Sequence, residues 1–205
     1  MENYAEVSSF VLRSALSYQA VRRLIGIEEL ICLAKRRGLH TIAITDHDTF
    51  AGAVRGVNIG KRAGVNVIPG AELSAVDPAT GRRVHILCYN CASAARLEGL
   101  CRRTLESRKK AATEMLRRVM RYYPISPELV VRCATGSAAV YKQHIMHALM
   151  DAGFADSIFG EVFERLFNKE NGVAVAAVEY PDVRDVITQV HEAGGIAVLA
   201  HPYAY

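Results

Sequence analysis

The hydrophobic positions of this chain alternate between helical and strand-like spacing from residue 26 onward. In "IEELICLAKRRG" the apolar residues recur at the spacing of one helix face, and basic residues and a glycine close the segment. The run from Thr41 to Thr45 is mostly β-branched or apolar, which is typical of a short buried strand. The pattern therefore predicts a helix followed by a strand.

The same alternation continues to residue 89 and resumes near the end of the chain. We expect a helix from about Thr49 to Ala63, a strand in "VNVIPGAELSAV", a turn in "DPATG" and a strand in "RRVHILCY". Later, "YPDVRDVITQVHEAGG" predicts a helix opened by Pro181 and Asp182, and "IAVLAH" predicts a strand. Strands that alternate with helices place the chain in the α/β class.

Between about Ala92 and Asn171 the pattern indicates helices only. A long basic amphipathic segment, "ARLEGLCRRTLESRKKAATEMLRRVMRYY", is followed by "SPELV", "AAVYKQHIMHALMDAG" and "IFGEVFERLF". We expect residues 1–91 to form the first part of an α/β domain, 92–171 a helical insertion and 172–205 the continuation of the domain.

The composition indicates a globular, soluble protein. Hydrophobic residues make up 51% of the 205 residues and charged residues 22%. No apolar run is long enough for a membrane span, and the N-terminus lacks the ordered regions of a signal peptide, so we expect a cytoplasmic protein without a membrane partner. The net charge of +4 permits an anionic substrate without requiring nucleic acid.

The basic helix has two interpretations. Its Arg and Lys residues are interleaved with Glu98, Glu106 and Glu114, as in a solvated helix with i, i+4 ion pairs. The alternative is a stripe that binds nucleic acid, which tight, steeply salt-dependent binding of oligonucleotides would support. The sequence favours the solvated helix.

The five cysteines are odd in number and scattered, which argues against a disulfide framework. Cys88 and Cys91 form a C-x-x-C in "CYNC", a spacing that can bind zinc or carry out redox chemistry. No second such pair exists and no helix start follows closely, so the sequence alone does not favour either role.

Polar residues without an obvious packing role mark four of the predicted strands. "IAITDHD" places His47 between Asp46 and Asp48 just past a strand, "VIPGAELS" carries Glu72, "RRVHILCY" carries His85, and "IAVLAHP" ends with His201. Loops at the carboxyl ends of parallel strands converge on one rim, so these groups are expected to meet. Alternatively, Asp48 or Thr49 caps the next helix and Asp46 holds His47 in one tautomer.

Three imidazoles and a carboxylate are the ligand set expected for zinc, manganese or iron. A bridging glutamate lets two cations sit close enough to clamp a phosphate. The chain offers no competing active-site motif, since it contains no G-x-S-x-G, no Walker loop and no G-x-G-x-x-G.

The segments "GLHTIAITDHDTFAGA", "VIPGAELS", "VHILCY" and "AGGIAVLAHP", in this order and spacing, resemble the PHP (polymerase and histidinol phosphatase) superfamily of metal-dependent phosphoesterases. The segments "KQHIMHALMDAGF" and "VFERLFNKENG" are similar to the branch with a helical insertion that includes nucleoside 3',5'-bisphosphate phosphatases. The resemblance implies a distorted (β/α) barrel of parallel strands, with up to three divalent metals at their carboxyl ends.

Carried over to this chain, the resemblance implies that His47, Glu72, His85 and His201 are metal ligands, with Glu72 as the bridge. Asp46 and His47 are the expected catalytic residues, with His47 holding a cation or orienting the attack. His144 and Arg108 are expected to contact a small phosphorylated substrate, plausibly a nucleotide, whereas a packed helix position is the better interpretation of His147.

The chain departs from the family pattern at both ends. Placing "RSALS" on the family's first motif puts Val11 and Arg13 where two histidine ligands are expected, and neither side chain offers a lone pair to a metal. The late Asp-x-His is absent, and "HPYAY" replaces the branch's "HPGRY". Either the chain is a fragment or it is a degenerate member, so the barrel is expected to be incomplete at its C-terminus.

These departures predict fewer metal ions than the family's two or three, and little or no phosphatase turnover. The alternative function is a non-catalytic binding or regulatory module that keeps the fold and perhaps one metal. Two or more tightly bound ions in the purified protein would favour the enzyme.

Overall fold

The computed structural model describes residues 10–12, 26–137 and 139–202 of the chain. The described residues form two compact units: those up to Cys101 together with those from Pro181 onward, and Arg102–Tyr180. Both divisions fall several residues C-terminal of the predicted domain boundaries after residues 91 and 171. In the described part of the chain, no helix is both long and apolar enough to cross a membrane.

The first unit is built on a five-stranded sheet in the order β1-β2-β3-β4-β5. The strands are β1 (Phe10–Leu12), β2 (Thr41–Ile44), β3 (Asn66–Val76), β4 (Arg83–Tyr89) and β5 (Ile196–Leu199). β1, β2 and the first part of β3 pair in parallel, whereas β3 with β4 and β4 with β5 pair antiparallel. The structure is therefore a mixed α/β fold, and the expectation of parallel strands is wrong for the second half of the sheet.

A tight turn between β3 and β4 causes the reversal. The Asp77 carboxylate accepts hydrogen bonds from the Ala79 amide (3.0 Å) and the Thr80 hydroxyl (2.7 Å), and Gly81 has a φ of +67°. Such a turn returns the chain beside the strand it has just left, and a hairpin of this kind joins only antiparallel strands.

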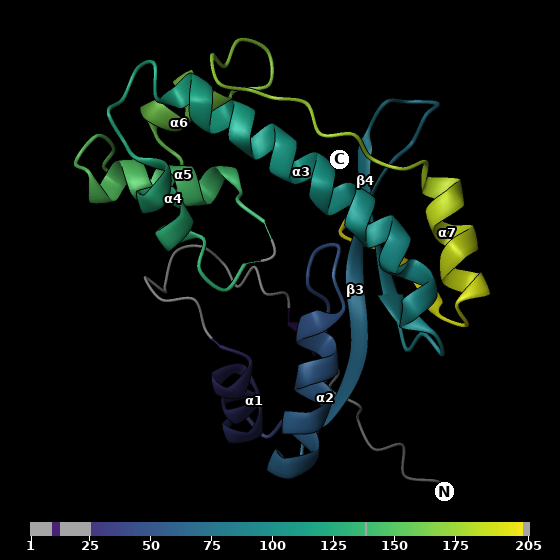
Figure 1. Ribbon diagram of the computed structural model, residues 1–205. Coiled ribbons are helices and arrows are strands. Elements are labelled where there is room, and N and C mark those ends of the chain that lie inside the picture. The colour runs from purple at the N-terminus through teal and green to yellow at the C-terminus, as the bar shows by residue number, and fades with distance from the viewer. Residues whose placement is uncertain (1–9, 13–25, 138, 203–205) are drawn as a thin grey trace, which may run out of the picture. The chain divides into compact units, whose positions relative to one another are not determined.

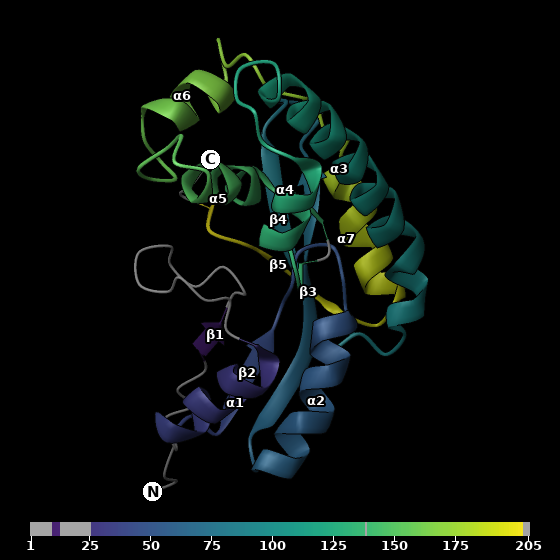
Figure 2. The same cartoon turned by 60° about the vertical axis from the view of Figure 1, so that its left-hand side comes forward.

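Two helices cover the parallel half of the sheet. α1 (Ile27–Arg36) and α2 (Ala51–Ala63) pack with β2 and the start of β3 around a core that includes Ile31, Ile42 and Val67. Figures 1 and 2 show α2 running alongside β3. Gly60 permits this approach, because a Cβ there would lie 2.5 Å from both the Val65 carbonyl oxygen and Val67 Cγ2.

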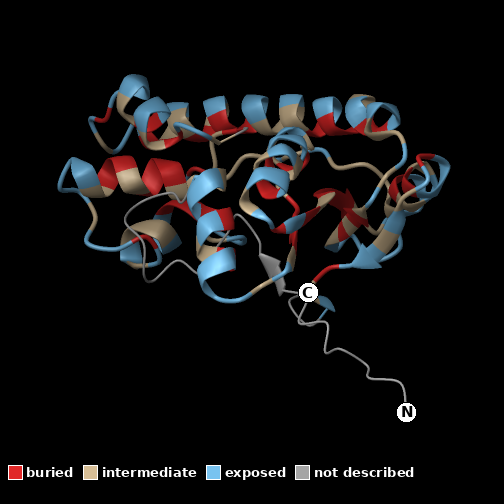
Figure 3. Ribbon diagram, turned by 90° about the horizontal axis from the view of Figure 1, so that it is seen from below, coloured by how far each residue is buried: buried red, intermediate tan, exposed pale blue. Residues whose placement is uncertain are grey.

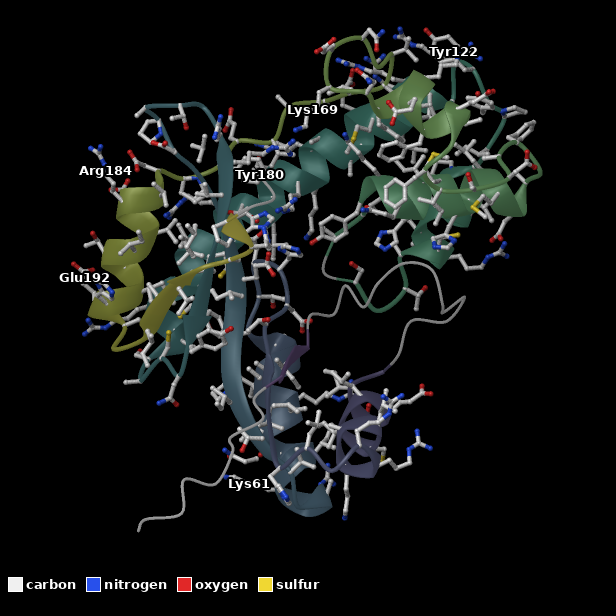
Figure 4. The ribbon with its side chains drawn as sticks, turned by 180° about the vertical axis from the view of Figure 1, so that it is seen from behind. Lys61, Tyr122, Lys169, Tyr180, Arg184 and Glu192 are labelled. Atoms are coloured by element: carbon white, nitrogen blue, oxygen red, sulfur yellow. The ribbon has the colours of Figure 1, made fainter. Side chains whose placement is uncertain are left out.

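The antiparallel half has a separate core against α7 (Val183–Glu192). As predicted, α7 begins beside Asp182, whose carboxylate caps the helix by accepting a hydrogen bond from the Arg184 amide (2.8 Å). Val186 and Val190 are fully buried on the inner side, while Arg184 and Glu192 project from the outer side (Figure 4). The short 3₁₀ helix Ala94–Leu97 and the residues that follow it complete this core.

The second unit contains most of α3 (Glu98–Val119), with α4 (Pro127–Cys133), α5 (Lys142–Asp151) and α6 (Glu161–Phe167). Its own core draws on all four helices and includes Met115, Val130 and Leu149. α3 is buried along one side and exposed along the other (Figure 3). On the exposed side, Glu114 accepts hydrogen bonds from Arg117 and Arg118, as expected for a solvated helix.

Candidate metal centre

The chain past β2 continues alongside β3 and carries the D-H-D sequence with it. The Glu72 amide donates to the Asp46 carbonyl (3.0 Å), and the Asp48 amide donates to the Glu72 carbonyl (3.1 Å). These bonds pair His47 with Glu72 in the parallel register already set by β2 and β3. The backbone of β3 thereby places the His47 imidazole beside the Glu72 carboxylate.

Asp48 anchors this segment and does not cap α2. Its buried carboxylate accepts a hydrogen bond from the Ser74 amide (2.8 Å) and another from the Ser74 hydroxyl (2.9 Å). Its φ of +53° is a left-handed conformation that Asp tolerates better than most residues. At the helix start, Thr49 Oγ1 instead accepts from the Ala51 amide. Sequence reasoning missed this anchoring role, although both residues lie in the quoted motifs.

The Asp46 side chain lies on the side of the D-H-D segment that faces α2. Its carboxylate lies against Gly52 in the first turn of α2, at a position where a Cβ would overlap the carboxylate oxygen. The absence of a side chain at Gly52 leaves the room that this carboxylate occupies. A catalytic role for Asp46 stays a prediction.

The Glu72 carboxylate is the centre of the cluster. Its Oε1 atom lies 2.8 Å from His85 Nδ1, 3.1 Å from His201 Nε2 and 3.9 Å from His47 Nε2. The two imidazoles nearest to it are also close to each other, since His85 Nδ1 lies 3.1 Å from His201 Nε2. The structure thus brings together all four residues that the sequence analysis selected as metal ligands.

The antiparallel pairing of the sheet explains how His85 and His201 meet. Glu72 stands directly opposite Leu87 in the β3–β4 ladder, and His85 stands opposite Ser74 two residues away on the same face. The Ala200 amide donates to the His85 carbonyl (2.9 Å), which extends the β4–β5 ladder and delivers His201 next to His85. Glu72 and His85 therefore lie within β3 and β4, and only His47 and His201 follow the ends of strands.

Burial makes this arrangement electrostatically demanding. The Glu72 side chain is only 1% exposed, whereas those of His47, His85 and His201 are 23–26% exposed. A buried carboxylate is costly unless positive charge and hydrogen bonds compensate it. The Glu72 charge also acts on Tyr89. Burial, and to a smaller extent this charge, raise the pKa of Tyr89.

The spacing of the donor atoms fits a bound cation. Ligand atoms about 2.1 Å from one ion are about 3.0 Å apart at right angles and about 3.4 Å apart at tetrahedral angles. Glu72 Oε1, His85 Nδ1 and His201 Nε2 lie 2.8–3.1 Å from one another, which is hydrogen-bond distance and is also close enough for the three atoms to share one ion. One ligand atom from each of His47, Glu72 and His85 also falls within 4.8 Å of the others. Imidazole and carboxylate donors suit Mn, Fe and Zn.

The predicted substrate contacts lie in the second unit. The Arg108 guanidinium lies over the rings of Tyr141 (5.4 Å) and Tyr180 (5.3 Å). His144 Nδ1 accepts a hydrogen bond from the Tyr141 amide (3.0 Å), and burial and then the neighbouring His147 lower the His144 pKa. Arg108 and His144 thus gather around one tyrosine, and their contact with a substrate stays a prediction.

Position 11 lies in β1, where its backbone pairs with Ala43 of β2, so a strand does form at the expected first motif. Arg13 and residues 203–205 of "HPYAY" lie outside the described residues.

Comparison with known proteins gives one consistent result. The sequence profile of the PHP domain matches residues 13–196. A phosphoribosyl 1,2-cyclic phosphate 1,2-diphosphodiesterase from Eggerthella lenta is 37% identical over 177 residues, 85% of this chain and 67% of that protein. The 5'-3' exoribonuclease Rnm of Escherichia coli is 30% identical over 182 residues, 87% of this chain and 60% of that protein.

The solved structures agree with the sequence matches. A Bifidobacterium adolescentis structure, described as a metal-dependent phosphoesterase, superposes with a TM-score of 0.77 at 27% identity. That superposition covers 86% of this chain and 61% of the other. An amidohydrolase structure from Chromobacterium violaceum, with sulfate and no metal, has a TM-score of 0.74 at 22% identity, a likeness of fold. This chain therefore spans roughly three-fifths to two-thirds of these relatives.

Proposed function

Because the chain belongs to the PHP domain family, we propose that the cluster around Glu72 binds a divalent metal ion and serves the hydrolysis of a phosphoric ester. The observation that carries this proposal is the convergence of three imidazoles on one buried carboxylate oxygen. An uncompensated buried carboxylate is costly in a packed core, whereas a metal ion compensates the charge and binds imidazole and carboxylate donors of this kind.

Glu72, His85 and His201 would hold the ion, and His47 stands at the edge of the group. A bound divalent ion polarises a phosphoryl oxygen and lowers the pKa of a coordinated water. Within the chain, the rigid β3–β4 ladder fixes Glu72 and His85, while the bonds from Asp46 and Asp48 to β3 fix His47. His47, whose ring lies edge-on to that of His85 at 5.0 Å, orients the attacking water or holds a second cation.

Imidazole and carboxylate donors suit manganese, iron and zinc, and two histidines with one carboxylate are also typical of iron sites. The ion in this proposal is therefore Mn²⁺, Fe²⁺ or Zn²⁺, and the donor set alone does not select among them.

The substrate class in this proposal is a phosphodiester or a small phosphorylated nucleotide. The named relatives, a cyclic-phosphate diphosphodiesterase and 5'-3' exoribonucleases, all act on phosphodiester bonds according to their names. In the second unit, the Arg108 cation and the His144 imidazole would steer the phosphate. Tyr141 and Tyr180, over whose rings Arg108 lies, would hold this cation in place.

We further propose that turnover by this chain is weak. Val11 and Arg13 stand where the family resemblance implies two histidine ligands, so a second ion would lack donors. One ion cannot clamp both the attacking and the leaving oxygen as a close pair does. The same substitutions favour the second candidate, a module that binds a metal and a phosphorylated ligand without hydrolysing it.

Metal content and diesterase activity test the proposal together. Bound Mn, Fe and Zn are measured by elemental analysis, and hydrolysis of bis(4-nitrophenyl) phosphate and 4-nitrophenyl phosphate is followed with each metal. Glu72→Gln removes the central charge with little change of shape, and Glu192→Gln on the outer side of α7 is the matched control. We expect Glu72→Gln to lower metal affinity by at least about tenfold.

Val11→His combined with Arg13→His should raise metal affinity, because it restores two donors. Stoichiometric metal with no hydrolysis in any variant would support the binding module. Metal binding unchanged by Glu72→Gln would overturn the site itself.

A further inference from the structure

The C-x-x-C pair lies on the opposite face of β4 from the metal centre. Cys88 stands opposite Ala71 in β3 and Ala197 in β5, so its side chain points away from the face that carries Glu72 and His85. It is fully buried in the core that packs against α7. The proposed phosphoesterase chemistry makes no use of this pair.

The backbone brings the second cysteine back to the first. Asn90 has a φ of +51°, a left-handed conformation, and its amide donates to the Pro69 carbonyl (2.9 Å). This turn ends β4 and folds Cys91 over Cys88, so that the two Sγ atoms lie 2.6 Å apart. A disulfide needs about 2.05 Å, and the two sulfur atoms are already nearer than unbonded thiols pack, so the backbone holds the pair at near-bonding distance.

The turn after α7 is shaped around the sulfur atoms. A Cβ at Gly195 would lie 2.5 Å from Cys91 Sγ and 3.1 Å from Cys88 Sγ, and a Cβ at Gly194 would lie 3.0 Å from Ala92 Cβ. The Ser93 amide also donates to the Ala193 carbonyl (3.1 Å). The chain on both sides of the pair is therefore held, and the two thiols cannot easily swing apart.

The two sulfur atoms differ in access. Cys91 is half-buried and open to a small reagent, whereas Cys88 is enclosed. Burial, and then the hydrogen bond with Cys91, raise the pKa of Cys88, which keeps that thiol protonated at neutral pH. The arrangement has a half-buried thiol, Cys91, that can react first and a fully buried partner, Cys88, that can resolve it.

To bind zinc, Cys88 and Cys91 would need further ligands. A structural zinc site needs four donors, mostly Cys and His. The third nearby thiol, Cys101, is buried and its pKa is raised to about 12. Within the described ranges, the candidate metal ligands with mutually close donor atoms lie around Glu72, and no cysteine is among them.

We propose that Cys88 and Cys91 form a reversible disulfide on exposure to a peroxide. The Cys91 thiolate attacks one peroxide oxygen, the O–O bond breaks, and one water leaves after protonation. The Cys88 sulfur then attacks the oxidised Cys91 sulfur, the S–O bond breaks, and the departing hydroxide takes the Cys88 proton as a second water. Two thiols are oxidised to one disulfide and one hydrogen peroxide is reduced.

Peptide mapping of the full 205-residue chain tests this inference. The chain is treated with hydrogen peroxide, alkylated under denaturing conditions and digested with trypsin. Residues 84–96 form one tryptic peptide that holds both cysteines, and Cys101 falls in the next one. The expected product is the 84–96 peptide, unalkylated and lighter by two hydrogens, which dithiothreitol converts back to its doubly alkylated form.

Variants separate this disulfide from general thiol oxidation. Cys32→Ser, at an exposed free cysteine, should leave the product unchanged, whereas Cys88→Ser should leave Cys91 singly oxidised and able to form a mixed disulfide with glutathione. A cross-link between peptide 84–96 and the Cys101 peptide would overturn the pairing. Retention of two alkylatable thiols in peptide 84–96 after peroxide would overturn the inference, and this measurement on the unaltered chain does not depend on any variant folding.

Discussion

Replacing Asp48 by Ala should destabilise the first unit far more than an ordinary surface change. The substitution removes two hydrogen bonds from a buried carboxylate to Ser74, at 2.8 Å and 2.9 Å, and leaves the Ser74 amide unsatisfied. Hydrogen bonds to charged groups contribute about 1.5–3 kcal/mol each. The φ of +53° adds about 1 kcal/mol for Ala. We therefore expect a loss of about 4–7 kcal/mol in the free energy of unfolding.

Two matched variants sharpen this prediction. Asp48→Asn keeps an acceptor for the Ser74 amide and a residue that tolerates the left-handed conformation, so its loss should be about 1 kcal/mol. Asp77 accepts one backbone amide and one hydroxyl in the same way, but in an exposed turn. Asp77→Ala should therefore have a much smaller effect than Asp48→Ala.

The assay combines urea unfolding, followed by circular dichroism, with hydrogen exchange of β3 peptides that contain the Ser74 amide. Exchange at that amide should accelerate strongly in Asp48→Ala and little in Asp77→Ala. If Asp48→Ala lies within about 1 kcal/mol of the unaltered chain, or matches Asp77→Ala, the anchoring role assigned to Asp48 is wrong.

Three further changes test other parts of the structure. Gly52→Ala should lower the melting temperature because its methyl group displaces the Asp46 carboxylate, whereas Gly26→Ala, where a Cβ meets only a Glu28 oxygen at 3.8 Å and the change affects only the N-cap of α1, should lower it much less. Asp182→Ala should cost about 1 kcal/mol by removing the α7 cap, and Asp182→Asn should restore most of it in urea titrations. The lowered His144 pKa means that the unfolded chain binds a proton more readily, so stability should fall as the pH drops below about 6.5. His144→Gln should weaken that dependence, and an unchanged slope would contradict it.

The order of helices and strands could be predicted because periodicity is a local property of the chain. The stop at Gly64, the cap at Asp182 and the buried run of β2 all act within a few residues, and each element forms where they indicate. The meeting of His47, Glu72, His85 and His201 was predicted from a rim of parallel strand ends, whereas Glu72 and His85 lie within β3 and β4 and only His47 and His201 follow strand ends.

What the sequence could not supply depends on pairing across the sheet. Asp48 precedes a helix, so a cap was a reasonable local interpretation, and only the β2–β3 register brings it to Ser74. His85 lies inside a strand, and its approach to His201 needs the antiparallel β4–β5 pair. The division after Cys101 falls inside α3, whose continuous helical pattern contains no signal for a boundary between two cores.

The sheet also sets an order in which the parts of the molecule can fold. The core of α1, α2, β2 and early β3 joins residues close in sequence, from about 27 to 67, and such local contacts form quickly. The β4–β5 pair must close a loop that contains the whole second unit, at an entropic cost that grows with loop length. Folding of that unit shortens the loop, since the Glu179 amide donates to Ser107 Oγ near its two ends. His201 reaches the other three ligands only through β5, so the metal centre is complete only once this long loop has closed.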